Sequence, residues 1–218
     1  MIFFKNVSKS YRLKGSTKVV IDRLTLRLKK GESLGLLGRN GAGKSTLLKM
    51  IGGTLSPDSG EIQRSGSISW PLGFSGGFHM ALTGVQNARF IARIYGVDTD
   101  DLVDFVEDFS ELGKFLQMPV GSYSSGMRAR LAFGVSMGIN FDCYLVDEIT
   151  AVGDAIFKRK CQQVFREKLK HADVIMVSHS AETIRDFCTT VAVLENGHLT
   201  HFDDVNQGIS AYEKMMAG

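Results

Sequence analysis

A glycine-rich run, GRNGAGKS at residues 38–45, has the residue types that hold phosphate groups. It matches G-x-x-x-x-G-K-[ST] and lies between a short apolar run at 33–37 and a helical pattern at 44–51. Glycines let successive N–H groups face one anion, and the following helix adds the positive end of its dipole. Lys44 would reach the β- and γ-phosphates, and the Ser45 hydroxyl would hold Mg²⁺. The run predicts a nucleoside triphosphate site rather than a turn that merely joins strand to helix.

Two carboxylates, Asp147 and Glu148, directly follow the apolar run 143–146. Strands often end in acidic turns, so this pair alone would be weak support for a site. The phosphate cradle strengthens it, because adjacent strands of one sheet would bring Asp147 to the metal. Successive strand side chains point opposite ways. Asp147 would therefore hold Mg²⁺, directly or through water, while Glu148 would orient and deprotonate the attacking water.

His179 follows a second buried-strand pattern at 174–177. A lone histidine in this place is usually structural. In a phosphoryl-transfer site it would instead contact the γ-phosphate and sense its presence.

A Ser-Ser-Gly turn at residues 124–126 precedes a helical pattern at 125–138. Ser124 or Ser125 would cap that helix. The same turn at a helix N-terminus is also an anion site that suits a γ-phosphate. The residues by themselves leave both interpretations open.

The elements that must position these residues alternate between strand and helix. Strand patterns lie at 21–29, 33–37, 143–146 and 174–177, and helical patterns at 44–51, 85 to about 116, 125–138 and 155–170. This alternation predicts a mostly parallel sheet covered on both faces. One helical face carries an apolar stripe that we interpret as core: Leu102, Phe105, Val106, Phe109, Leu112 and Leu116. The pair Asn196-Gly197, between strand-like runs, predicts a type I′ hairpin.

The composition is that of a folded globular protein of one domain, or of one domain with a small subdomain. The chain has 218 residues, and its net charge of +3 is too small to indicate nucleic acid or anionic lipid. Its three cysteines, Cys143, Cys161 and Cys188, share no metal-binding spacing and are expected to be reduced thiols in a cytosolic protein. The N-terminus is unlike a signal peptide, and no apolar run approaches the roughly 20 residues of a membrane helix.

Taken in order, the motifs resemble those of the ABC transporter ATPases. They lie at 38–46, 123–127, 147–148, 151–154 and 179, so that the resemblance covers essentially the whole chain. Residues 123–127 stand where that family has its LSGGQ signature. Ser124 and Gly126 match it, whereas Tyr123, Ser125 and Met127 depart from it.

The resemblance implies an α/β fold of the ABC-type P-loop NTPase class. This fold has a mostly parallel core sheet, an N-terminal antiparallel β subdomain and an inserted α-helical subdomain. It implies a single domain over 1–218, with the insertion at about 79–139. ATP and Mg²⁺ would be the cofactors, with Tyr11 stacking on adenine and Asp154 in the D-loop. The implied ATP-binding residues are Tyr11, Gly38, Asn40, Gly41, Gly43, Lys44, Ser45 and Thr46.

The family further implies a head-to-tail dimer, in which Ser124, Ser125 and Gly126 would contact ATP held by the partner copy. Because the chain has one of each motif, we expect that partner to be a second copy of itself. ATP would close the pair, and hydrolysis would release it.

The stretch SISWPLGFSGGFHMALTG, residues 67–84, resembles that of the capsular polysaccharide exporter (KpsT-like) ATPases within the family. We interpret it as a joint that faces a membrane permease, with Trp70, Phe74 and Phe78 as docking or core aromatics. The family's loop glutamine has no counterpart in the expected place. His79 is its possible replacement, since Gln86 lies too far along.

The resulting prediction is the ATPase subunit of an exporter that moves capsular polysaccharide across the inner membrane through a separate permease. The chain would sit at the cytoplasmic face, held by the permease, with a periplasm-spanning export partner. The alternative is an exporter of O-antigen, teichoic acid or another lipid-linked glycan, although O-antigen ATPases often carry an added C-terminal domain for which no room is expected here. A soluble ABC ATPase acting on ribosomes or DNA is disfavoured, because strongly basic segments are missing, so no nucleic-acid partner is expected.

Overall fold

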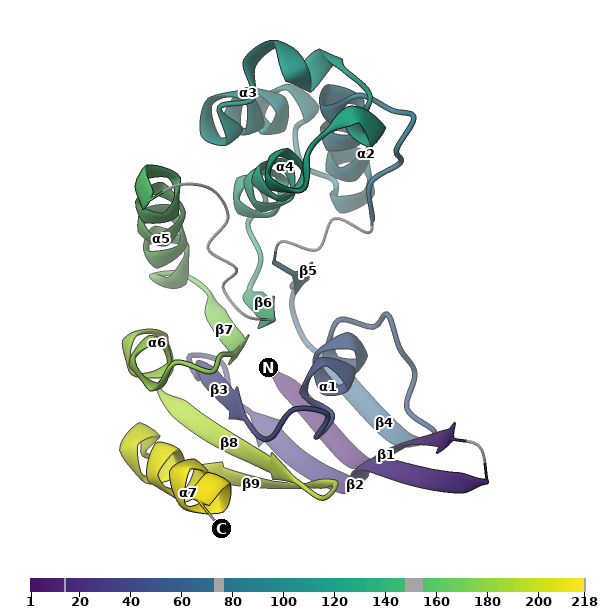
Figure 1. Ribbon diagram of the computed structural model, residues 1–218, viewed down its shortest axis with the longest axis vertical. Helices are drawn as coiled ribbons and strands as arrows, with labels where there is room; N and C mark the ends of the chain where they lie inside the picture. The colour runs from purple at the N-terminus through teal and green to yellow at the C-terminus, as the bar shows by residue number, and fades with distance from the viewer. Residues whose placement is uncertain (14, 73–76, 148–154, 218) are drawn as a thin grey trace. The chain divides into compact units, whose positions relative to one another are not determined.

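The chain folds into two compact units in the computed structural model (Figure 1). The structure describes residues 1–13, 15–72, 77–147 and 155–217. The first unit comprises Met1–Pro71, Asp142–Glu148 and Ala172–Gly218, and the second comprises Leu72–Phe141 and Ile149–His171. The predicted helical insertion, about 79–139, falls entirely in the second unit. Its bounds within a single domain stay a prediction.

Three strands of the described part of the first unit form an antiparallel sheet in the order β2-β1-β4. They are β1 (Ile2–Leu13), β2 (Ser16–Leu28) and β4 (Ser59–Arg64). The strand predicted at 21–29 is the second half of β2, in which buried Leu24 and Leu28 alternate with exposed Arg23 and Arg27. This alternation places one face of the sheet on the core and the other in solvent.

Six strands of the described residues form the second sheet, in the order β5-β6-β7-β3-β8-β9. Their bounds are β3 (Leu34–Leu37), β5 (Ile68–Pro71), β6 (Cys143–Asp147), β7 (Asp173–Val177), β8 (Thr190–Glu195) and β9 (His198–Phe202). All pairings are parallel except that of β8 with β9. The predicted hairpin is confirmed, because Asn196 and Gly197 have φ of 49° and 84°, both positive as a type I′ turn requires.

Three helices of the described first unit accompany these sheets: α1 (Lys44–Ile51), α6 (Ala181–Phe187) and α7 (Val205–Ala217). Figure 1 shows α7, in yellow, along β8 and β9, which it contacts. The core joins both sheets to α1. Its fully buried members include Phe4 of β1, Ile21 of β2, Leu36 of β3, Leu47 of α1 and Leu145 of β6. Residues from five elements thus fix the sheet edge where the cradle begins.

The second unit is helical where the structure describes it. It contains α2 (Gly84–Tyr95), α3 (Thr99–Ser110), α4 (Ser125–Gly138), α5 (Ala155–Leu169) and the short 3₁₀ turns η2 (Gly113–Gln117) and η3 (Val120–Ser122). The Phe109 ring of α3 stacks on Phe133 of α4 at 5.8 Å and meets Phe157 of α5 edge-on at 5.4 Å. Among the described helices, none combines the length and the apolar character needed to cross a membrane.

The expectation of one helical run from 85 to about 116 is wrong. Gly96 ends α2 in the left-handed region at φ 67°, and Asp98 begins α3 by accepting bonds from the Asp100 and Asp101 amides. These caps outweigh the continuous apolar spacing. The stripe is core, as expected, except that Phe105 is only half-buried.

The three cysteines are free and buried. Burial raises the pKa of the Cys143 and Cys188 thiols to about 12 and that of Cys161 to about 11. They are therefore protonated thiols at neutral pH, in agreement with the predicted reduced state.

Candidate nucleotide-binding site

The predicted phosphate cradle joins β3 to α1, and its glycines are required by close contacts. A Cβ on Gly38 would lie 2.5 Å from the Leu194 carbonyl oxygen, and one on Gly43 would lie 3.0 Å from that of Val20. Gly41 and Gly43 also have φ of 75° and 116°, which L side chains rarely adopt. The loop can therefore curl only with glycine at these places.

Lys44, the first residue of α1, places its amine inside the cradle. The residue is 8% exposed, and Nζ donates to the carbonyl oxygens of Gly38 at 2.6 Å and Arg39 at 3.1 Å. This geometry holds a cation at the start of a helix, where the helix dipole also favours negative charge. When a phosphate enters, its anionic oxygens would replace these two carbonyl oxygens as the acceptors of the Lys44 amine.

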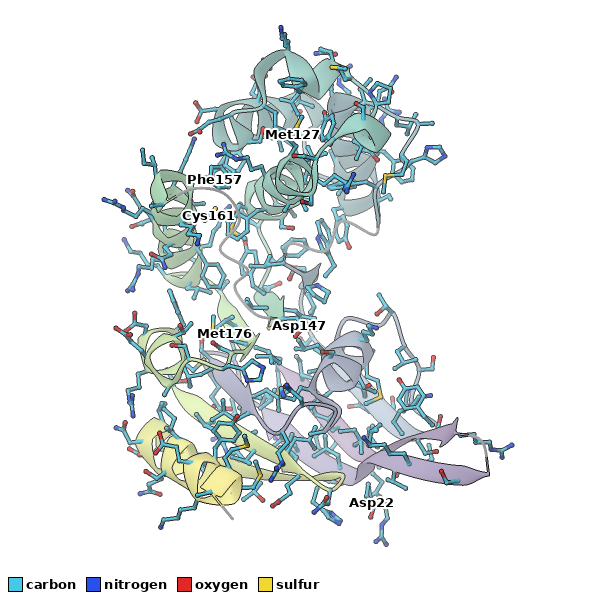
Figure 2. All side chains as sticks on the ribbon, viewed as in Figure 1. Asp22, Met127, Asp147, Phe157, Cys161 and Met176 are labelled. Carbon is cyan, nitrogen blue, oxygen red and sulfur yellow. The ribbon has the colours of Figure 1, made fainter. Side chains whose placement is uncertain are left out.

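The carboxyl ends of three strands bring the acid and the histidine to the same edge. Asp147 of β6 is paired in register with Val177 of β7, and Val177 with Leu36 of β3. Figure 2 shows Asp147 at the end of β6. The strand of Asp147, β6, was expected to lie next to the cradle strand β3, but β7 lies between them. At two strand spacings, the Asp147 and Leu36 backbones are roughly 10 Å apart. His179 follows β7 at this edge and is exposed.

A cavity of about 440 Å³ collects most of the predicted ATP-binding residues. Its lining residues are Tyr11, Lys18, Val20, Asn40, Gly41, Gly43, Lys44, Ser45, Thr46, Asp147, Val177 and His179. The volume is within the usual range for small-molecule sites. Of the predicted ATP-binding residues, Gly38 does not line the cavity; it is buried, and its carbonyl accepts a hydrogen bond from Lys44.

Two residues of β2, Lys18 and Val20, also line the cavity, although the sequence analysis did not place them there. Lys18 of β2 donates from Nζ to the Gly41 carbonyl at 2.9 Å, which adds a second cation beside Lys44. Val20 contributes an apolar wall and is buried. Neither belongs to a local motif, and both are brought here by the pairing of β2 with the rest of the unit.

Tyr11 lines the cavity, and the residue is 40% exposed. Its hydroxyl lies 3.3 Å from Thr46 Oγ1, and the Lys9 amine lies 5.9 Å from its ring centroid. An exposed aromatic ring beside the phosphate cradle suits stacking on a flat base. Its role in adenine binding stays a prediction.

Acidification is expected to destabilise the part of β1 that carries Tyr11, because protonation of Asp58 weakens its bonds to Lys9 and Ser10. The Lys9 amine, at 2.6 Å, and the amide and hydroxyl of Ser10, at 2.7 and 2.9 Å, lower the Asp58 pKa from 3.8 to about 2. Since the folded-state pKa is the lower one, the carboxylate stabilises the fold above about pH 4, and this contribution disappears as pH falls towards 2. Urea unfolding from about pH 5 to about pH 2 should show a steeper loss of unfolding free energy for wild type than for Asp58→Asn. If wild type and Asp58→Asn lost unfolding free energy equally over this pH range, the assigned role of the Asp58 carboxylate would be wrong.

The predicted signature turn lies in the second unit, at the start of α4. Ser124 is the N-cap, and its Oγ accepts from the Met127 amide at 3.2 Å. Ser124 and Ser125 are exposed, and a Cβ on Gly126 would meet only Ser124 Oγ, at 3.9 Å. Helix capping is therefore present, and it leaves the turn accessible for a further ligand.

The remaining predicted residues are placed only in part. Glu148, Asp154 and Phe74 lie outside the described residues. His79 is exposed in the second unit, and its amide donates to Asn87 Oδ1 at 2.8 Å. Gln86 lies within the first turn of α2, where its Oε1 accepts from the Thr83 amide at 2.9 Å. The capping box thus occupies Gln86 in ordering α2.

Trp70 and Phe78 have different environments. Trp70 lies in the edge strand β5 and is half-buried, whereas Phe78 is 8% exposed and is a core residue of the second unit. Part of the 67–84 stretch is therefore a strand of the large sheet, and the boundary between the two units falls within the stretch, between Pro71 and Leu72.

Comparison with known proteins agrees with this arrangement. Residues 21–151 match the family model described as ABC transporter. The chain is 49% identical to ATP-binding protein BexA of Haemophilus influenzae, over 98% of this chain and 99% of that protein. It is 48% identical to capsule polysaccharide export ATP-binding protein CtrD of Neisseria meningitidis, over 99% and 100% of the two.

A solved structure shows the same fold. A dimeric ATP-binding cassette in a post-hydrolysis state, bound to ADP and Pi, matches with a TM-score of 0.76 over 92% of this chain and 98% of that one, at 21% identity. The mostly parallel sheet, the N-terminal antiparallel sheet and the helical unit predicted from the motifs are thereby confirmed. The chain belongs to the ABC transporter family and is one of its ATP-binding subunits, an ATPase.

Proposed function

We propose that this ATPase drives the export of capsular polysaccharide across the inner membrane through a separate permease. The observation that carries the proposal is the 48% identity, over 99% of this chain, to a protein described as a capsule polysaccharide export ATP-binding protein. The cavity supports ATP binding and hydrolysis, since one site contains two lysines, a carboxylate and an exposed aromatic ring.

In the proposed site, Lys44 binds the β- and γ-phosphates and the loop of Asn40, Gly41 and Gly43 surrounds them. Ser45 and Asp147 line the same cavity and offer the hard oxygen ligands that Mg²⁺ takes together with phosphate and water. They therefore fit the ion, which when bound would neutralise charge on the transferring phosphoryl group.

Water attack is assigned to the residues at the strand ends. Glu148, next in the chain after Asp147, orients and deprotonates the water, and His179 contacts the γ-phosphate. Exposure of His179 at the cavity supports this assignment. Asp154 belongs to the D-loop, and His79 takes the place of the family's loop glutamine.

The proposed working form is a head-to-tail pair of this chain, in which Ser124, Ser125 and Gly126 of one copy contact the ATP of the other. Exposure of both serines supports it, because the cap bond uses one acceptor position of Ser124 and leaves both hydroxyls accessible to a ligand. The pair would bind the permease at the cytoplasmic face of the membrane, with a periplasm-spanning export partner on the far side.

Removal of the chain from its own host tests the proposal. Surface capsule should disappear while polysaccharide accumulates inside the cell, and the wild-type chain should restore export where Lys44→Met does not. A mild-detergent pull-down should recover a polytopic permease. Loss of a different lipid-linked glycan with normal capsule would move the chain to another glycan exporter, and unchanged glycans of every class would refute transport of either kind.

A further inference from the structure

The signature turn, residues 123–126, is anchored by a tyrosine that its motif does not explain. Tyr123 is 3% exposed, although two exposed serines follow it. Its hydroxyl donates to the Phe115 carbonyl at 2.6 Å, and its own carbonyl accepts from Arg128 Nη1 at 2.6 Å. Side chain and backbone are thus both held immediately before Ser124.

The Tyr123 hydroxyl also lies close to Gly84, the first residue of α2. A Cβ on Gly84 would lie 2.6 Å from the Tyr123 hydroxyl oxygen and 2.9 Å from Leu116 Cδ2, so alanine there would force these side chains to shift. Gly84 is the last residue of the unusual 67–84 stretch. That stretch and the signature turn therefore meet at this contact.

Backbone pairing joins the same two segments a second time. The Gly121 amide donates to Met80 at 2.8 Å, the Val120 amide donates to Leu82 at 2.9 Å, and Thr83 and Pro119 form an antiparallel bridge. Asn87, 1% exposed, further ties the turn at 79–83 by donating to the carbonyls of His79, Leu82 and Thr83. Because these bonds tie the turn to Asn87 of α2, it has little freedom to move independently of that helix.

We infer that Tyr123 is a positioning residue for Ser124. Tyr123 joins the turn at 79–83 to the signature turn, so that the two turns move as one body. The inference rests on the proposed function, in which Ser124 contacts ATP held by a second copy. A displacement of the 79–83 turn by a bound permease would then move Ser124 directly. The hydroxyl anchor exists because this chain has tyrosine where the family signature begins with leucine.

The test measures ATP-dependent pairing of the full chain in the Glu148→Gln background, where hydrolysis does not complicate the result. Tyr123→Phe removes only the hydroxyl and should weaken pairing about fivefold or more, as one lost hydrogen bond allows. ATP affinity of the unpaired chain should be unchanged, because the cradle lies in the other unit. Sedimentation velocity with ATP and titration with a fluorescent ATP analogue give the two numbers. Tyr95→Phe, at the opposite end of α2, is the matched control and should pair as the parent does.

A second variant reaches the same contact from the other side. Gly84→Ala should weaken pairing when Tyr123 is present and by a smaller factor when it is combined with Tyr123→Phe, since the hydroxyl it meets is then gone. An equal effect in both backgrounds would overturn the inference. So would a Tyr123→Phe chain that loses thermal stability yet pairs as tightly as the parent. If the Glu148→Gln parent fails to pair with ATP at all, the proposed paired site itself is refuted, and the role of Tyr123 falls with it.

Discussion

Replacement of Lys44 by methionine is expected to weaken ATP binding by about 100-fold or more and to abolish hydrolysis. The amine now has loop carbonyls as partners at 2.6 and 3.1 Å, and ATP would replace them with charged phosphate oxygens. Hydrogen bonds to a charged group contribute about 1.5–3 kcal/mol each, so the loss of two corresponds to about 3–6 kcal/mol. Methionine keeps the length of the buried stem, which limits the change to the lost charge and donors.

Titration with a fluorescent ATP analogue measures the Lys44→Met effect. Lys49→Met is the matched control, because Lys49 lies in the last turn of the same helix and is exposed. It removes an equal charge from α1 and should leave ATP affinity nearly unchanged. Equal losses in both variants would mean that net charge, rather than the amine inside the cradle, determines binding.

Replacement of Glu148 by glutamine is expected to lower the turnover rate by about 10²–10⁴-fold while ATP still binds. Glutamine keeps the shape but cannot accept the proton of the attacking water, and a general base contributes about that factor. Asp147 and Lys44 remain in the cavity, so the nucleotide keeps its main contacts. Phosphate release at saturating ATP measures the rate, and the analogue titration measures binding.

Glu195→Gln is the control for that substitution. Glu195 is also an acid at the carboxyl end of a parallel strand of the same sheet, since it ends β8, and it is exposed. Its replacement should leave turnover within about twofold of wild type, as for most surface substitutions. Undiminished hydrolysis in Glu148→Gln would remove Glu148 from the proposed role.

Local chemistry in the sequence was sufficient to predict the cradle. A glycine-rich loop between a buried strand and a helix has one workable shape, because its contacts are made within a few residues of each other. The capped helix at 125–138 and the type I′ hairpin at Asn196-Gly197 were predictable for the same reason. In each of these segments, residues close in the sequence both favour the local conformation and form the contact that stabilises it.

Competition between two local signals produced the clearest error. Apolar spacing runs on from 85 to about 116, but Gly96 and Asp98 end one helix and begin another. Periodicity reports which face is buried, whereas caps report where the backbone turns. The buried face continues across the turn because Leu102, Val106 and Phe109 pack into the same helical unit as α2.

Contacts between distant segments were decided only by the tertiary structure. Three features join residues far apart in the chain. They are the position of β7 between β3 and β6, the presence of Lys18 and Val20 in the cavity wall, and the contact of Tyr123 with Gly84. No spacing rule links such residues, because strand order and helix packing depend on the burial of the whole core rather than on neighbours in sequence. The sequence by itself thus determined the kind of chemistry and its main groups. The fold decided which further side chains share the cavity and what holds the signature turn in place.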